Sequence, residues 1–508
     1  MAQSAAVSRL ALAVAVALTC APLTAPRAQD DNTIRVTLAT LPPRHGNPFA
    51  TSATPSITTT SAIYDGLARF DKAGNLRPWL ATAWRNVDEK TWRFELRRDV
   101  NFSNGAPFTA EAVVNAVTYM NTSVRPIDNL VRDLPAMISA RALDSHTVEI
   151  TTKDSVPSFP RHMPFLALPE PDAWRKLGPE EFAKQPVGTG PFVLQTWEPA
   201  LASFAAFDGP GAWRKPKAAR LEIRALPEAT SRVQAILTGQ ADVAMQLGPD
   251  DLQTLEAAGH KGASWQDGGV TGISLVTTRN LPFNDVRVRR ALNHAVNRAP
   301  LIATIMQGKT VAANQPAARM VYGHNAELPA YDYDPIKAKK LLAEAGYADG
   351  FSFVMETSTT SGAQLATFQQ VAADLAAVGV KMEIRAMPGP QYLRNMFLTG
   401  EYADAVIVPW QTVPPIDVVR AVEIHSCDSK FPWYCDRDVM PLYQQALTEW
   451  DPAKALALRR ELSRIYHEQA PAIFLYEQVI YAGLSARTHG FDDSFGLVAY
   501  DQISVNGN

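Results

Sequence analysis

Strand patterns and helix patterns alternate along nearly the whole chain, and this alternation restricts the fold more than any other feature. Ile34, Val36 and Leu38 occupy every second position near the start, which is typical of a strand with one buried face. Asp334 and Pro335 predict a helix start, because aspartate caps helices and proline fits the first turn. Strands and helices that interleave in this way predict an α/β protein.

The alternation extends over 508 residues, which is more than one hydrophobic core usually serves. We therefore expect at least two lobes. No low-complexity linker separates the two halves of the sequence. Strands that cross from one lobe to the other, and hence a hinge, are expected instead.

The first residues have the pattern of a secretory leader. Arg9 precedes the apolar run 10–18, and small residues up to Ala28 precede the polar Gln29. The apolar run is shorter than the roughly 20 residues that a membrane-spanning helix needs. We predict a signal peptide at residues 1–28, and lipid attachment at Cys20 is the alternative.

Charge and cysteine content narrow the function further. Loss of the leader removes Arg9 and Arg27, which leaves 46 basic against 51 acidic residues and a formal charge of −5. Nucleic-acid binders carry basic patches, so no nucleic-acid partner is expected. Cys427 and Cys435 remain, and an even pair in an oxidising compartment predicts a disulfide. Two buried free thiols are the alternative.

The sequence lacks the common catalytic and metal-binding motifs. His467 and Glu468 begin like a zinc-binding HExxH, but Pro471 follows and the second histidine is missing, so His467 is expected at the surface. Residues 308–310 resemble the end of a phosphate-binding loop, but Ala303 replaces the required glycine. We expect no enzyme, cofactor or metal site, although catalytic groups can converge from distant positions.

Several segments in order resemble the peptide/nickel-type (family 5) extracellular solute-binding proteins of ABC transporters. The resemblance spans nearly the whole chain after the leader, and no single segment would be specific alone. The similar segments are 63–67 (IYDGL), 78–81 (PWLA) with Trp84, 92–110 (WRFELRRDVNFSNGAPFTA), 188–192 (GTGPF), 283–298 (FNDVRVRRALNHAVNR) and 334–347 (DPIKAKKLLAEAGY).

The resemblance implies a two-lobed periplasmic-binding-protein clamshell of type II, with an extra family-specific subdomain in the larger lobe. Lobe I would comprise residues 29–272, with the subdomain at about 66–189, and a C-terminal return at 477–508. Lobe II would comprise residues 273–476. Ligand would be enclosed between the lobes, and the closed form would dock on an inner-membrane ABC permease.

Departures from the dipeptide-binding relatives bear on the ligand. Those relatives hold the peptide ammonium with an aspartate that follows a tryptophan, which Trp410 matches, but here that aspartate is missing or displaced to Asp417. They also hold the peptide carboxylate with an arginine, and residues 356–361 (ETSTTS) contain none. A buried carboxylate without a cation costs several kcal/mol, so a zwitterionic dipeptide is disfavoured.

Six residues are candidates for ligand binding, and two of them have a structural alternative. Trp410 offers a flat surface and one N–H donor, but core packing would explain it equally well. Asp417 could instead cap a helix that begins at Val418. His425 could ligate a metal, although a lone histidine is more often structural. The predicted ligand-binding residues are Trp410, Asp417, Tyr64, Thr277, Ser358 and Thr359.

The sequence therefore predicts a monomeric periplasmic binding protein that passes a small peptide or another polar organic solute to an ABC permease. Ligand contacts from both lobes would shift the population toward the closed form. A secreted hydrolase and a signalling receptor on the same scaffold are the alternatives.

Overall fold

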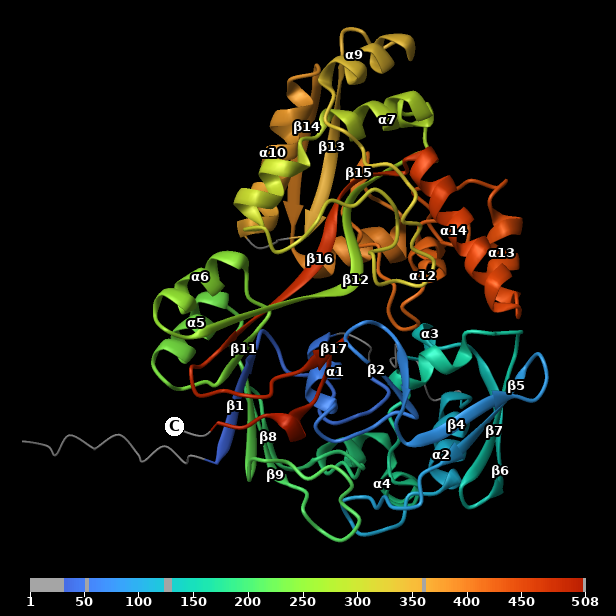
Figure 1. The fold of residues 1–508 in the computed structure, drawn as a ribbon, viewed down its shortest axis with the longest axis vertical. Coiled ribbons are helices and arrows are strands. Elements are labelled where there is room, and N and C mark those ends of the chain that lie inside the picture. Colours follow the sequence, from blue (N-terminus) through green and yellow to red (C-terminus); the bar gives the residue numbers. More distant parts are fainter. Residues whose placement is uncertain (1–31, 51–53, 123–129, 359–361, 506–508) are drawn as a thin grey trace, which may run out of the picture. The chain divides into compact units, whose positions relative to one another are not determined.

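The computed structural model describes residues 32–50, 54–122, 130–358 and 362–505 (Figure 1). The predicted leader, with Cys20, lies outside these residues. Ten strands form the largest sheet of the described chain, in the order β14-β13-β15-β12-β16-β11-β1-β10-β9-β8. The bounds are β1 (Thr33–Leu38), β8 (Phe192–Glu198), β9 (Leu201–Ala206), β10 (Arg220–Ala225), β11 (Val243–Met245), β12 (Lys261–Leu275), β13 (Phe351–Ser358), β14 (Val380–Met387), β15 (Ala405–Val406) and β16 (Ala472–Leu484).

Helices occur between the strands, so the predicted α/β class is confirmed. Asp334 caps α9 by accepting a hydrogen bond from the Lys337 backbone N–H at 2.8 Å, as its position before Pro335 predicted. The helices are α1 (Thr54–Thr60), α2 (Ala110–Met120), α3 (Leu130–Asp133), α4 (Pro171–Lys184), α5 (Ala229–Leu237), α6 (Pro249–Ala257), α7 (Val286–Ala295), α8 (Arg298–Pro300), α9 (Pro335–Glu344), α10 (Gly362–Ala376), α11 (Gly389–Arg394), α12 (Val418–Ile424), α13 (Met440–Thr448) and α14 (Pro452–Gln469).

A second, four-stranded antiparallel sheet lies within the segment predicted as a subdomain. Its order is β4-β5-β7-β6. Trp92, Phe94 and Leu96 of β5 are buried, which confirms the predicted apolar face of that strand. Its bounds are β4 (Ala81–Asn86), β5 (Thr91–Leu96), β6 (Met137–Asp144) and β7 (Thr147–Thr152), and the shorter strands elsewhere are β2 (Ala68–Phe70), β3 (Leu76–Pro78), β17 (Asp493–Ser494) and β18 (Leu497–Val498).

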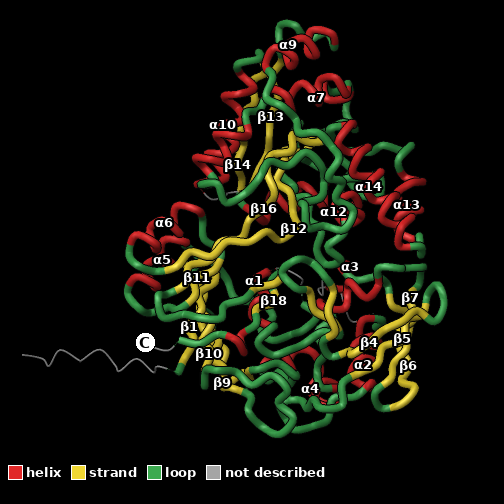
Figure 2. Tube along the Cα trace, in the orientation of Figure 1, coloured by secondary structure: helices red, strands yellow, loops and turns green. Residues whose placement is uncertain are grey.

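The two longest strands, β12 and β16, connect the two halves of the large sheet. They pair antiparallel over most of their length. At one end of this ribbon β16 also pairs with β11, and at the other end β12 also pairs with β15. Figures 1 and 2 show the two strands side by side. Both predicted lobe boundaries, Ile273 and Tyr476, lie within this ribbon, and they stay predictions.

The ribbon is interrupted near its middle. Its register shifts between Gln266 and Val270, where the chain forms an irregular stretch around Asp267 and Gly268. Gly268 has φ +85°, and a Cβ there would lie 2.8 Å from the Thr412 hydroxyl oxygen, so only glycine fits without strain. The β12–β16 ladder therefore loses its regular pairing at this glycine.

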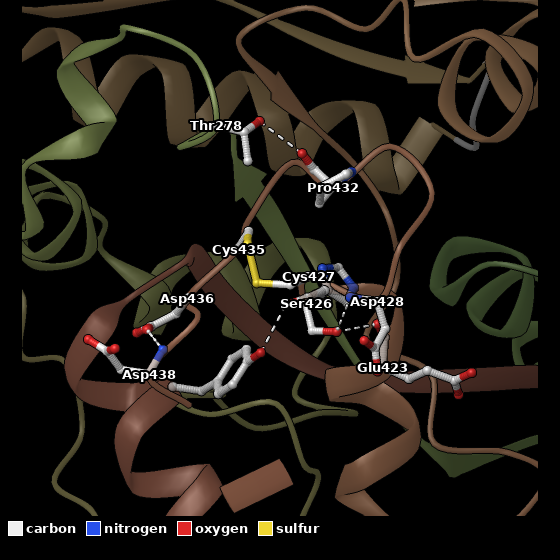
Figure 3. Close-up of a disulfide and its surroundings, with 11 residues drawn as sticks. Thr278, Glu423, Ser426, Cys427, Asp428, Pro432, Cys435, Asp436 and Asp438 are labelled. Carbon is white, nitrogen blue, oxygen red and sulfur yellow. Dashed lines mark hydrogen bonds between the residues drawn. A yellow bond between two sulfur atoms is a disulfide. The ribbon is translucent and has the colours of Figure 1, made fainter. Parts of the chain in front are cut away.

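Cys427 and Cys435 form the predicted disulfide, in the loop between α12 and α13 (Figure 3). The bond closes a loop with a sequence separation of 8. In the chain-entropy picture, closing such a loop stabilises the folded state by about 2.5 kcal/mol.

Replacing both cysteines by serine should lower the free energy of unfolding by about that amount, as measured by denaturant titration. Non-reducing peptide mapping checks the bond, and free thiols at both positions would contradict it.

Candidate functional site

A cavity of about 290 Å³ lies at the interruption of the β12–β16 ribbon, and we call it the hinge cleft. Its walls come from the crossing strands, from α1, α3 and the β17–β18 turn on one side, and from the loop before α12 on the other. It is lined by Thr54, Ile57, Asp133, Trp265, Asp267, Gln411, Val413, Pro414, Arg420, Gln478, Ile480, Asp493, Phe495 and Gly496.

Two carboxyl groups of the hinge cleft, those of Asp267 and Asp493, have raised pKa values. Asp267 lies in the ribbon interruption and accepts a hydrogen bond from the Gly269 backbone N–H at 2.9 Å. Asp493 is 5% exposed and accepts one from the Gly496 backbone N–H at 2.7 Å. Burial raises the pKa of Asp267 to about 6 and that of Asp493 to about 7. The charge of Asp267 also raises the Asp493 pKa, while Arg69 opposes this rise.

Arg420 brings a positive charge to the hinge cleft, but that charge is already paired. Its guanidinium donates to the Asp133 carboxylate at 2.8 Å and to the Glu423 carboxylate at 2.7 Å. The pair with Asp133 joins α12 to α3. Among the described lining residues, the remaining ionisable groups are Asp267 and Asp493, so the cleft has a net negative charge when these two carboxyls are ionised.

Neutral polar and aromatic side chains complete the hinge cleft. Gln411 donates from its side-chain amide to the side-chain oxygen of Gln478 at 2.9 Å, which joins the loop before α12 to strand β16. Trp265 contributes a half-buried aromatic surface from β12. None of these residues was predicted from the sequence. The Asp-Gly-Gly at 267–269 was an available signal, since glycines inside a strand pattern often mark a bulge.

Trp410 is fully buried and does not line the hinge cleft, although its neighbour Gln411 does. Its indole stacks on the His425 ring with centroids 3.6 Å apart, and Phe474 packs at 5.3 Å. These contacts support the core-packing alternative, and the ligand-binding role stays a prediction.

Asp417 is also fully buried, and its carboxylate is engaged. It accepts from the Val419 backbone N–H at 3.1 Å, which makes it the N-cap of α12. Its second carboxylate oxygen pairs with Arg459 at 2.7 Å. The helix-cap alternative therefore describes its position, and an ammonium ligand would have to compete with Arg459.

The other predicted residues are not brought together. The Tyr64 hydroxyl is buried and donates to the Gly46 carbonyl at 2.6 Å, on the edge of a different, smaller cavity. The Thr277 backbone N–H donates to the Trp433 carbonyl at 2.8 Å. Ser358 is half-buried at the end of β13. Thr359 lies outside the described residues.

Two histidines have structural roles. His425 is buried, which lowers its pKa to about 3, and it accepts a hydrogen bond from the Trp433 indole N–H at 2.9 Å. His467 is 9% exposed, so the expectation that it lies at the surface was wrong. It stacks on Tyr331 with centroids 4.6 Å apart, because α14 packs this face inward. Over the described ranges, we find no cluster of three potential metal ligands.

Comparisons with known proteins agree on one family. The sequence model of the bacterial extracellular solute-binding proteins, family 5 Middle, matches residues 75–423. Heme-binding protein A of Haemophilus influenzae is 28% identical over 485 residues, and the match covers 88% of each chain. Glutathione-binding protein GsiB of Escherichia coli K12 is 27% identical over 466 residues, covering 88% of this chain and 89% of the relative.

The solved structures agree on the fold. The structure of HbpA2 from Haemophilus parasuis superposes with a TM-score of 0.78 at 24% identity, covering 94% of this chain and 100% of that one. This similarity confirms the predicted two-lobed periplasmic-binding-protein fold. In the part of the chain that the structure describes, every helix is too short or too polar to cross a bilayer.

Proposed function

Because this chain belongs to the bacterial extracellular solute-binding proteins of family 5, we propose that it captures a small solute with a positively charged group in the hinge cleft. Substrate binding for an ABC importer is the function of this family, and this membership favours transport over hydrolysis or signalling. The cleft supports the proposal because its walls come from the β12–β16 ribbon and β17 and, across the cavity, from α12 and the loop before it.

The ligand's charge is inferred from the carboxylates of the cleft. Asp267 and Asp493 are costly to ionise without a partner, as their raised pKa values indicate. An ammonium group placed between them would neutralise the pair and offset their desolvation. This pair is the single observation that carries the proposed ligand class, and it joins two segments of the proposed lobe I that are far apart in the sequence.

A zwitterionic dipeptide is a poor fit for the same cleft. Its carboxylate needs a cation, and Arg420 already serves Asp133 and Glu423. Relatives named for heme and for glutathione indicate that cargo varies within the family. A cationic solute, such as an amine or a peptide whose carboxyl end is blocked or far from the cleft, is therefore favoured.

The mechanism follows from the position of the cleft. We propose that the two lobes pivot at the ribbon interruption and meet around the ligand, with lobe I formed by residues 29–272 and 477–508. Contacts from both lobes would supply the difference in affinity between the open and closed forms. The proposed protein is monomeric, is exported to the periplasm by the leader at residues 1–28, and docks on a membrane permease when closed.

The test is native mass spectrometry of protein exported to the periplasm and purified without denaturation. We expect a co-purified small molecule that carries an amine. Isothermal titration of the recovered compound, before and after blocking its amine by acetylation, should show binding only before blocking. A co-purified zwitterionic dipeptide or an anionic solute would contradict the proposal.

A further inference from the structure

A second cavity of about 220 Å³ adjoins the hinge cleft on the side of β1 and β11. The two cavities share Thr54 and Ile480. We call the second cavity the hydroxyl pocket. Its apolar walls include Leu38, Met245 and Val479.

The hydroxyl pocket contains two buried hydroxyl groups without hydrogen-bond partners. Thr58 is 1% exposed and Tyr481 is 5% exposed, and neither hydroxyl finds a partner among the described atoms. Buried hydroxyls are nearly always hydrogen-bonded, because leaving one unsatisfied costs free energy. Two such residues on the walls of one cavity make it a candidate site for a ligand that supplies the missing acceptor.

The pocket differs from the hinge cleft in charge. None of the described residues that line it is acidic or basic. Gln246 adds a polar edge: its side-chain oxygen accepts from the Ala39 backbone N–H at 2.8 Å, which leaves its amide nitrogen as a donor. Gln246 also has φ +57°, a strained conformation for a residue with a side chain, and such strain is common at ligand sites.

We propose that the hydroxyl pocket takes an uncharged, mainly apolar group of the same ligand, about the size of one ring, that carries a hydrogen-bond-accepting oxygen. This inference rests on the proposed function, since the group would belong to the solute whose cation occupies the hinge cleft. The size follows from the cavity, because an apolar cavity of roughly 150 Å³ can hold benzene. The oxygen would accept from the Tyr481 and Thr58 hydroxyls, and the Gln246 amide would supply a third donor.

The experiment uses four probe molecules, which differ in whether they carry an acceptor oxygen and in whether they carry an amine. Ethylbenzene and anisole are uncharged and nearly the same shape, but only anisole carries an acceptor oxygen. Their amine counterparts are 4-ethylphenethylamine and 4-methoxyphenethylamine. Affinities for the mature chain are measured by NMR titration. The oxygen-bearing probe should bind about fivefold more tightly in both pairs, against its lower hydrophobicity.

Three variants locate the effect. Tyr481→Phe and Thr58→Val each remove one pocket hydroxyl with little change in shape, and each should reduce the oxygen preference toward unity. Thr399→Val is the matched control, because Thr399 also has a buried hydroxyl without a partner but lies outside both cavities. This control should keep the wild-type preference.

The outcomes separate this inference from the proposed function. An oxygen preference that is absent from the wild-type protein, or that survives both Y481F and T58V, overturns the pocket proposal. A preserved oxygen preference with no gain in affinity from the amine supports the pocket and overturns the cationic cleft instead.

Discussion

Phenethylamine, or the amine that co-purifies with the protein, should bind on the order of a hundredfold more tightly at pH 8 than at pH 5. Asp493, with a pKa of about 7, is almost wholly protonated at pH 5 and mostly ionised at pH 8. Only the ionised form attracts a cation, so this residue alone accounts for about a hundredfold in affinity. The amine stays protonated throughout this range. Isothermal titration at several pH values measures the dependence.

A variant of Asp493 tests the cause of this pH dependence. Asp493→Asn should weaken binding at pH 8 and flatten the pH profile between pH 6 and 8, while Asp267 retains a shallower dependence near pH 6. Asp172→Asn is the matched control, since it removes one exposed charge from α4 and should leave the profile unchanged. Equal affinity at pH 5 and pH 8, or an unchanged profile in D493N, would contradict the assignment.

The unliganded protein offers a second readout of the same groups. Both carboxyls have pKa values raised in the folded state, so their contribution to stability is fully present below about pH 4 and is lost as the pH rises through 6 and 7. These two carboxyls should therefore lower the unfolding temperature of the free protein at pH 8 relative to pH 5. A bound cation should reverse most of this loss.

Much of the fold could be predicted because the relevant signals are local. Alternating apolar residues such as Ile34, Val36 and Leu38 identify a strand within six residues, and all three are buried in β1. The cysteine pair was predictable from its count and compartment. A strand pattern or a cysteine pair can be recognised without knowing which residues pack against it.

The site was harder to predict because its groups meet only in three dimensions. Asp267 and Asp493 lie in the middle of the chain and near its end, and only the crossing ribbon and the β17–β18 turn bring them to one cavity. The sequence left open whether Asp417 binds ligand or caps a helix, and it did not show that Arg459 from α14 pairs with its carboxylate. His467 is buried because Tyr331, from a distant part of the chain, stacks on it, and the sequence around His467 does not show that contact.

Replacing Trp410 by alanine should lower the free energy of unfolding by about 3–5 kcal/mol, the usual cost of truncating a fully buried large aromatic residue. The indole is 0% exposed and stacks against His425, so its loss would leave a cavity and expose the buried imidazole to an unfilled space. Urea titration measures the change. Trp197→Ala is the control, because Trp197 is half-buried on β8 and should cost clearly less.

Ligand titration of the folded fraction of W410A then separates its two roles. If Trp410 is a core residue, the folded variant should bind the co-purified amine with nearly wild-type affinity, because Gln411 rather than Trp410 faces the hinge cleft. Lost binding with unchanged stability would instead establish Trp410 as a ligand contact. That result would require the loop before α12 to turn its indole toward the cleft when the lobes close, since in the present arrangement Phe474 and His425 cover it.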